Sequence, residues 1–180
     1  DYNKLGEQID AMNYRRRFVY DTEANMVEVR NEREDAYRFS YDPLNRVTAE
    51  AGFDGLKWEY AYDLADQLIA RTDPAGRVIR FIHDLRGRVI EKQRPDGTLI
   101  SFGYDRAGRL TEADSPGSEL VFKYDAIGQV VWESQNGQVV EHEYDEIGRR
   151  IKRRSPSGQV VEFTYDADSN LSRLETPRGS

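Results

Sequence analysis

Hydrophobic and polar residues alternate at period two in short segments spread along the chain. In one such segment Tyr104, Phe102 and Ile100 are apolar, whereas Ser101 between two of them is polar. Alternation of this kind is typical of a β-strand with one apolar face. Apolar residues three and four apart, the spacing of a helix face, do not recur. The pattern therefore predicts strands rather than helices.

The alternating segment recurs, and each copy ends in an aromatic residue followed by aspartate. The spacings between successive copies are 21, 21, 21, 21, 20, 20 and 21 residues. The eight copies end at Tyr20, Tyr41, Tyr62, His83, Tyr104, Tyr124, Tyr144 and Tyr165. Two residues earlier in each copy stand Phe18, Phe39, Tyr60, Phe81, Phe102, Phe122, His142 and Phe163. Self-similarity at a fixed period predicts a repeat architecture built from one supersecondary unit.

Two kinds of turn separate the predicted strands. The first, here called the Tyr-Asp turn, has glycine or another turn-forming residue three positions after the aspartate, as in Asp105 and Gly108. A second apolar column follows it. The other, here called the outer turn, has a glycine seven residues before the next aromatic-Asp pair, at Gly55, Gly76, Gly97, Gly117, Gly137 and Gly158. Glycine permits the positive φ that tight reversals require, so each unit is predicted to be one antiparallel hairpin.

These elements predict an all-β fold of tandem antiparallel hairpins, about 21 residues each, in a curved and continuous sheet. Residues 1–19 read as a degenerate first repeat, and residues 20–180 as eight repeats with no separate second domain. In the 20-residue units the missing residue is expected to be lost from the outer turn. Such a strip buries its apolar columns fully only against further strands, so we expect one arc of a larger wall. Its two edge strands would be open to self-association.

The repeated Tyr-Asp-x-x-Gly-Arg-Leu/Val unit resembles the YD repeat of the Rhs family. It is clearest at Tyr104 to Leu110 and at Asp84 to Val89, and the resemblance covers about residues 14 to 180. That family includes bacterial Rhs and wall-associated polymorphic toxins, the C component of Tc insecticidal complexes, and animal teneurins. The resemblance implies a spiralling sheet that closes into a hollow shell.

In bacterial members such a shell encloses a toxic C-terminal domain, which self-cleavage often frees from the core. The resemblance therefore implies a structural segment of a secreted or delivered bacterial effector, made in the cytoplasm. Its implied partners are the rest of the shell and the enclosed toxin domain. The family's core ends in a motif built around Asp-Pro-x-Gly. The same residue types occur here at Asp73-Pro74-Ala75-Gly76, but they occupy a regular outer turn. We therefore expect this chain to be a segment of the shell wall that contains neither the cleavage site nor the toxin.

Architectural residues are accordingly the predicted functional positions. They are Tyr20, Tyr41, Tyr62, Tyr104, Tyr124, Tyr144, Tyr165, Phe81, Phe102, Phe122, Phe163, Gly97, Gly137 and Gly158. The aspartates after the aromatic column fill one slot eight times, which favours a role in the turn, accepting backbone N–H bonds, over catalysis. His83 and His142 stand in aromatic columns and are too few for a typical zinc site. We expect no catalytic residue, cofactor or metal.

Composition narrows the remaining classes of function. The 180 residues carry a net charge of −7 and contain no cysteine, which argues against a nucleic-acid partner and excludes disulfide scaffolds and thiolate metal sites. No apolar run approaches the 18 residues of a membrane-spanning helix.

The alternative to a shell is an extracellular binding or adhesion module, whose aromatic stripe at Trp58 and Tyr60 would contact glycan or protein. The basic cluster from Arg149 to Arg154 reads as a solvated face, with Arg150 unusual in an otherwise apolar column.

Overall fold

The computed structural model describes residues 6–12 and 14–176, which form seventeen β-strands. In every pairing whose register is described, the two strands are consecutive in the sequence and antiparallel. Within this part of the chain no helix occurs, and none therefore could cross a membrane. The predicted all-β class and tandem hairpins are confirmed.

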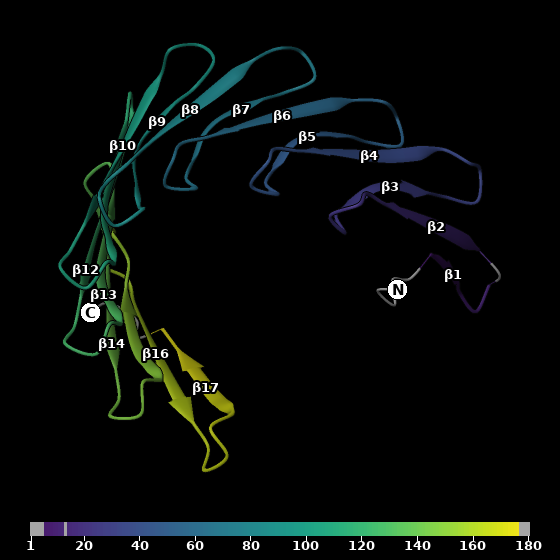
Figure 1. The fold of residues 1–180 in the computed structure, drawn as a ribbon. Helices are drawn as coiled ribbons and strands as arrows, with labels where there is room; N and C mark the ends of the chain where they lie inside the picture. Colours follow the sequence, from purple (N-terminus) through teal and green to yellow (C-terminus); the bar gives the residue numbers. More distant parts are fainter. Residues whose placement is uncertain (1–5, 13, 177–180) are drawn as a thin grey trace. The chain divides into compact units, whose positions relative to one another are not determined.

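The chain divides into two compact units, with the boundary inside strand β9. The first unit comprises residues 1–88 and 92–97, and the second comprises residues 89–91 and 98–180. In Figure 1 the hairpins of the first unit follow one another along a curved row. The first eight strands are β1 Glu7–Ile9, β2 Arg15–Tyr20, β3 Met26–Arg30, β4 Ala36–Tyr41, β5 Val47–Ala51, β6 Lys57–Tyr62, β7 Leu68–Thr72 and β8 Val78–His83. The others are β9 Val89–Gln93, β10 Leu99–Tyr104, β11 Leu110–Ser115, β12 Ser118–Tyr124, β13 Val130–Gln135, β14 Gln138–Tyr144, β15 Arg150–Arg154, β16 Val160–Tyr165 and β17 Leu171–Glu175.

A register shift recurs at each described pairing across a Tyr-Asp turn. In the hairpin of β4 and β5, Tyr41 pairs with Val47, whereas Ser40 pairs with Ala49, so one residue of β5 has no partner. The same shift occurs in the hairpins that contain Tyr20, Tyr62, Tyr104, Tyr124, Tyr144 and Tyr165. An extra residue of this kind bends the strand and increases its right-handed twist. Repetition of the shift therefore gives each hairpin the same local bend.

The outer turns have two lengths. In the 21-residue units five residues separate the strands, as between Thr72 and Val78. In the two 20-residue units only two residues do so, and Ser115 pairs with Ser118 while Gln135 pairs with Gln138. The residue missing from these units is thus absent from the outer turn, as predicted. Residues 136 and 137 have φ of 51° and 77°, the paired positive values of a type I′ turn that an Asn-Gly sequence favours.

The aromatic columns share one face of the strands, here called the ladder face. Along β6 the alternation is clear, because Trp58, Tyr60 and Tyr62 are half-buried and the intervening residues are exposed. Full burial is rare, however: among the described residues the buried side chains are Ala49, Ser134 and His142. No large side chain of the described chain is completely enclosed. The ladder face is therefore covered only in part by the strands that are present.

The degenerate first repeat that the sequence indicates over residues 1–19 is described only in part. Its first five residues and residue 13 lie outside the described residues, and β1 and β2 form the rest of it. Gln8 pairs with Arg16 in this hairpin. The division into one degenerate and eight regular repeats in a single domain stays a prediction.

Candidate functional site

Each Tyr-Asp turn is organised by its aspartate. At Asp63 one carboxylate oxygen, Oδ1, accepts the backbone N–H of Ala65 at 2.8 Å and of Gln67 at 2.9 Å. The backbone N–H of Asp63 in turn donates to the carbonyl of Gln67. Oδ1 accepts the N–H four residues on in the turns of Asp21, Asp42, Asp84, Asp105, Asp125, Asp145 and Asp166 as well. The prediction that these aspartates accept backbone N–H bonds within the turn is confirmed.

The residue four positions after the aspartate links one Tyr-Asp turn to the next. Arg46 donates from Nε to Asp42 Oδ2 at 2.8 Å within its own turn. Its Nη1 donates to the backbone carbonyl of Asp63 at 2.9 Å and to Asp66 Oδ1 at 2.8 Å in the following turn. The same guanidinium lies 4.9 Å from the ring centre of Tyr62. One side chain therefore combines an ion pair, a turn-to-turn bond and a cation–π contact.

Arg109 and Arg149 repeat this arrangement in the second unit. Arg109 bonds to the aspartate of its own turn at 2.6 Å, to the carbonyl of Asp125 at 3.2 Å, and stacks on Tyr124 at 4.6 Å. Arg149 bonds to its own aspartate at 2.7 Å and to Ser169 Oγ at 3.1 Å, and stacks on Tyr165 at 4.8 Å. Each of these arginines thus joins its own Tyr-Asp turn to the next one. The sequence pattern predicted where the arginines stand but not these bonds.

The tyrosine column ties each hairpin to the one before it. The phenol of Tyr62 donates to the backbone carbonyl of Val47 at 2.9 Å, across 15 residues of sequence. Equivalent bonds, across 14 or 15 residues, join Tyr41 to Met26, Tyr104 to Val89, Tyr124 to Leu110, Tyr144 to Val130 and Tyr165 to Arg150. At position 83 histidine replaces tyrosine and has no phenol to donate. Tyr20 ends β2 in the same column.

The other predicted positions also lie at repeated places in the fold. Phe81, Phe102, Phe122 and Phe163 are half-buried on the ladder face. The guanidinium of Arg150 lies 4.8 Å from the ring centre of Phe163, which explains how a cation is accommodated in an apolar column. The outer-turn glycines have positive φ, 85° at residue 97, 77° at residue 137 and 82° at residue 158. Together these residues form repeated rows of turns and aromatic rings along the sheet.

A polar cluster on the ladder face was not predicted. Glu50 pairs with Phe39 across the hairpin, and its two oxygens accept the phenols of Tyr37 at 2.8 Å and Tyr60 at 2.6 Å. Desolvation, aided by the hydrogen bond to Glu50, raises the pKa of Tyr60 to about 12. The hydrogen bond to Glu50 also raises the pKa of Tyr37. The face is therefore not uniformly apolar.

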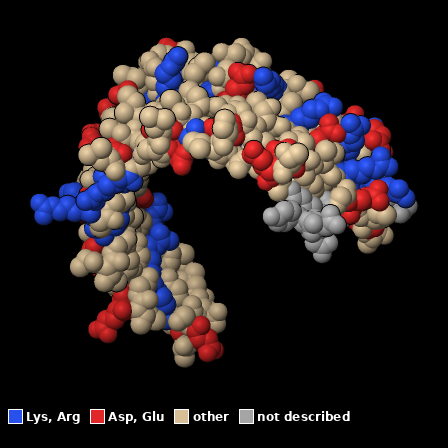
Figure 2. Space-filling model, viewed as in Figure 1, with Lys and Arg blue, Asp and Glu red and all other residues tan. Residues whose placement is uncertain are grey.

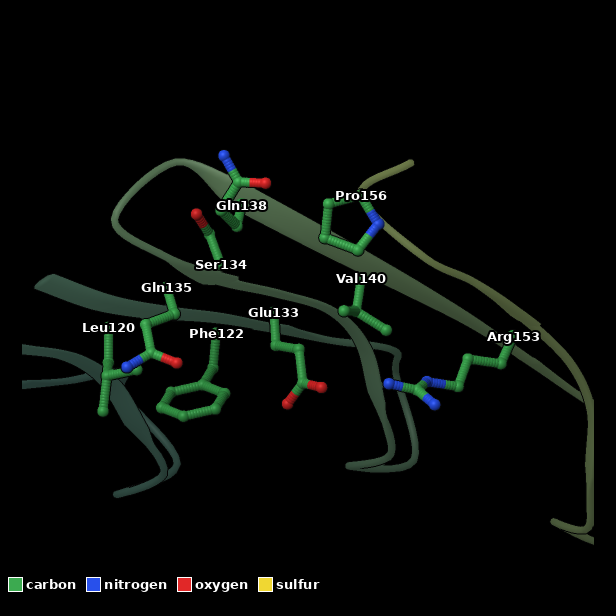
Figure 3. Close-up of a pocket in the computed structure, with 9 residues that line it drawn as sticks. All are labelled: Leu120, Phe122, Glu133, Ser134, Gln135, Gln138, Val140, Arg153 and Pro156. Carbon is green, nitrogen blue, oxygen red and sulfur yellow. The ribbon is translucent and has the colours of Figure 1, made fainter. Parts of the chain in front are cut away.

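The second unit has a cavity of about 430 Å³ on the same face (Figure 3). Leu120, Phe122 and Val140 supply apolar side chains, and Glu133 and Arg153 extend into the same space. Nearby, His142 is buried, and its Nε2 lies 3.4 Å from Glu133 Oε1. No group of three or more histidine, aspartate or glutamate side chains within the described ranges could hold a metal ion.

Charges of both signs are interspersed on the surface, which matches the many local ion pairs (Figure 2). Hydrogen bonds from Arg88 to the carboxylate of Asp84 lower the pKa of that group from an ordinary value of 3.8 to about 2. The pKa is also lowered at Asp42 by its side-chain bond to Arg46 and at Asp105 by its backbone bond to Arg109. These carboxylates therefore stay ionised well into the acid range.

The lowered pKa values predict acid sensitivity with a defined sign. Because the folded pKa of Asp84 lies below its unfolded value, the stability that it contributes is fully present above pH 3.8 and is lost as the pH falls through about 2. We expect the urea midpoint of the chain to change little between pH 7 and about 5 and to fall between about 4 and 2. Asp84→Asn should flatten that fall. An unchanged acid slope in this variant would show that the Asp84 bond does not contribute.

Comparison with known proteins identifies one family and a group of structures. A family model described as the teneurin YD-shell matches residues 14–175. A search of curated proteins found no match. The crystal structure of TcdB2-TccC3 without its hypervariable C-terminal region aligns with a TM-score of 0.76 at 17% identity, over 95% of this chain and 11% of that chain.

Two further structures align in the same way. A Tc holotoxin pore from Photorhabdus luminescens, carrying a mutation in TccC3, gives a TM-score of 0.69 at 16% identity, over 91% of this chain and 10% of that chain. A crystal structure of TcdB2-TccC3 gives 0.69 at 14% identity, over 94% of this chain and 11% of that chain. At these identities the likeness establishes the fold. The chain spans about a tenth of the length of the structures that it matches.

Proposed function

The chain belongs to the teneurin YD-shell family and is thus a structural shell segment, and we propose that the shell encloses a C-terminal toxin domain until delivery. The observation that carries the proposal is the partial cover of the ladder face. Repeated aromatic rings there are half-buried and held in place by bonds between hairpins. When further strands of the shell or an enclosed chain pack against this face, its exposed apolar area is removed from water, which stabilises the assembly.

The Tyr-Asp turns support a continuing wall as well. Large apolar side chains occupy the tips of five of them and are exposed: Leu44, Leu64, Leu85, Ile127 and Ile147. Single exposed apolar residues are ordinary on protein surfaces, but these recur within the same kind of turn, three of them two residues after the aspartate and two directly after it. Exposed apolar side chains at these turns suit contact with an adjoining part of the shell.

The partners in this proposal are the rest of the shell and its toxin domain. The structures similar to this chain are toxin complexes of TcdB2 with TccC3, and the proposal extends that setting to a secreted or delivered bacterial effector. The isolated chain is also expected to self-associate through edge strands. Leu171 and Leu174 of β17 are 52% and 57% exposed, and an uncovered edge strand offers unpaired backbone groups.

The adhesion alternative has less support. Stacking on glycan would need open aromatic faces, but the guanidinium of Arg71 lies 4.6 Å from the ring centre of Trp58. The phenol of Tyr60 is already bonded to Glu50. Both rings named for glycan binding therefore have partners within the sheet.

Limited proteolysis of the native full-length product tests enclosure. We expect its C-terminal tail to resist proteinase K while the wall is intact. Asp125→Ala combined with Asp145→Ala should make the tail cleavable, because both changes remove turn bonds in the wall. Glu119→Ala, an exposed change, should leave the tail protected. Rapid cleavage of the wild-type tail, or a native product without further repeats, would contradict enclosure but not the wall fold.

A further inference from the structure

A pocket lined by arginines lies between two successive outer turns of the first unit. It has a volume of about 400 Å³, and Arg77, Arg80 and Arg94 contribute to its lining. Arg77 precedes β8, Arg80 lies within β8, and Arg94 follows β9. Three arginines thus line one hollow, in a chain whose net charge is −7.

Two of the three arginines have no ion pair with any residue that the structure describes. Arg77 donates from Nε to Asp73 Oδ2 at 2.6 Å, and its side chain is 69% exposed. Over residues 6–12 and 14–176, Arg80 and Arg94 form no ion pair and no side-chain hydrogen bond, whereas most arginines beside a Tyr-Asp turn do. Asp96, the carboxylate of the same outer turn as Arg94, is engaged in another contact. The pocket therefore holds a surplus of positive charge.

The second unit contains the same pocket with different side chains. That pocket, also about 400 Å³, has Gln138, Glu141 and Ser155 at the positions of the three arginines. Its remaining cation, Arg154, is paired with Glu141 at 3.2 Å. The hollow between outer turns is thus a product of the repeat, but the arginine set is not required to build it.

Arg94 also replaces a residue that stabilises its turn. At the equivalent place in other outer turns, Asp73 and Asn31 each accept two backbone N–H groups through Oδ1. Ser155 accepts one through its hydroxyl. A guanidinium has no acceptor, so Arg94 forgoes these bonds. A position that breaks a local rule without structural gain is a candidate for function.

We propose that this pocket binds the carboxylates of an acidic protein segment. Guanidinium groups match carboxylates in planar, two-point hydrogen bonds, and cations spread over two turns suit several carboxylates in succession. A long nucleic acid would meet repulsion from the rest of this acidic chain. The outer turn that holds Glu32, Glu34 and Asp35 illustrates the kind of segment meant. The inference stands apart from enclosure, because it needs only the pocket.

Fluorescence anisotropy with a labelled peptide of alternating aspartate and glutamate tests the proposal on the whole chain. The double variant Arg80→Gln with Arg94→Ser should weaken binding at least tenfold. The control pair Arg33→Gln with Arg153→Gln makes the same change of charge elsewhere and should alter binding less than twofold. Loss of binding at raised salt is expected for the wild type. Absence of peptide binding, or equal loss in both pairs, would overturn the proposal.

A third variant separates binding from folding. Arg94→Asp introduces the acceptor that Asp73 supplies in the preceding outer turn, so it should raise the urea midpoint while weakening peptide binding at least tenfold. If Arg94 served only the fold, this substitution would not raise the urea midpoint and weaken peptide binding at the same time. A single-stranded oligonucleotide serves as the competing ligand class: if it binds more tightly than the peptide, and through the same arginines, the assignment to an acidic protein segment is wrong.

Discussion

Replacing Phe122 with alanine is expected to lower the free energy of unfolding by about 2 to 3 kcal/mol. The ring lies on the ladder face in the middle of the second unit, opposite Glu133, and lines the cavity with Leu120 and Val140. Because it is half-buried, we expect less than the about 3 to 5 kcal/mol lost when a fully buried phenylalanine is truncated. Urea denaturation followed by circular dichroism measures the change.

Glu119→Ala is the matched control for this variant. Glu119 lies on the same strand but is exposed, so its truncation should change stability by no more than about 0.5 kcal/mol. A loss of that size for Phe122→Ala as well would mean that the aromatic column does not stabilise the sheet.

Asp125→Ala is expected to cost about 2 kcal/mol, because it removes several hydrogen bonds at once, each worth about 1 kcal/mol. Its Oδ1 accepts the N–H of Ile127 at 3.0 Å and of Gln129 at 2.8 Å, and its Oδ2 accepts the side-chain amide of Gln129 at 3.1 Å. The backbone groups left behind lie in a tight turn and lose their acceptor. Urea denaturation again gives the magnitude.

Asp125→Asn separates geometry from charge. Asparagine keeps one carbonyl oxygen that can accept the same backbone N–H groups, so it should retain more than half of the lost stability. Gln129 is neutral, which means that no ion pair within this turn depends on the charge of Asp125. An equal loss in both variants would contradict the assignment of the slot to turn geometry.

Local features of the fold could be predicted from the sequence because they depend on residues close together in the chain. Alternation at period two and regularly spaced glycines determine the hairpins, and the aspartate of each Tyr-Asp turn bonds within four residues of itself. The loss of one outer-turn residue at Asn136 and Gly137 followed from the spacing alone. Each of these inferences needs no knowledge of how hairpins sit beside one another.

Contacts between hairpins could not be predicted in this way. The bridge from Arg46 to Asp66 and the bond from Tyr62 to Val47 depend on register and on the reach of long side chains. Glu50 on the ladder face was likewise missed, since a charged residue in a strand is usually assigned to the solvent side. The arginine pocket could not be predicted either, because it is recognised only when the hollows between outer turns in the two units are compared in three dimensions.

The tyrosine bonds have a direction that bears on how the protein is made. The bonded phenols of Tyr41, Tyr62, Tyr104, Tyr124, Tyr144 and Tyr165 each find their acceptor upstream, 14 or 15 residues nearer the N-terminus. A hairpin emerging from the ribosome can therefore dock at once on its completed predecessor, without waiting for later sequence. Contact order stays low however many copies are added, so folding time need not grow with the size of the finished protein.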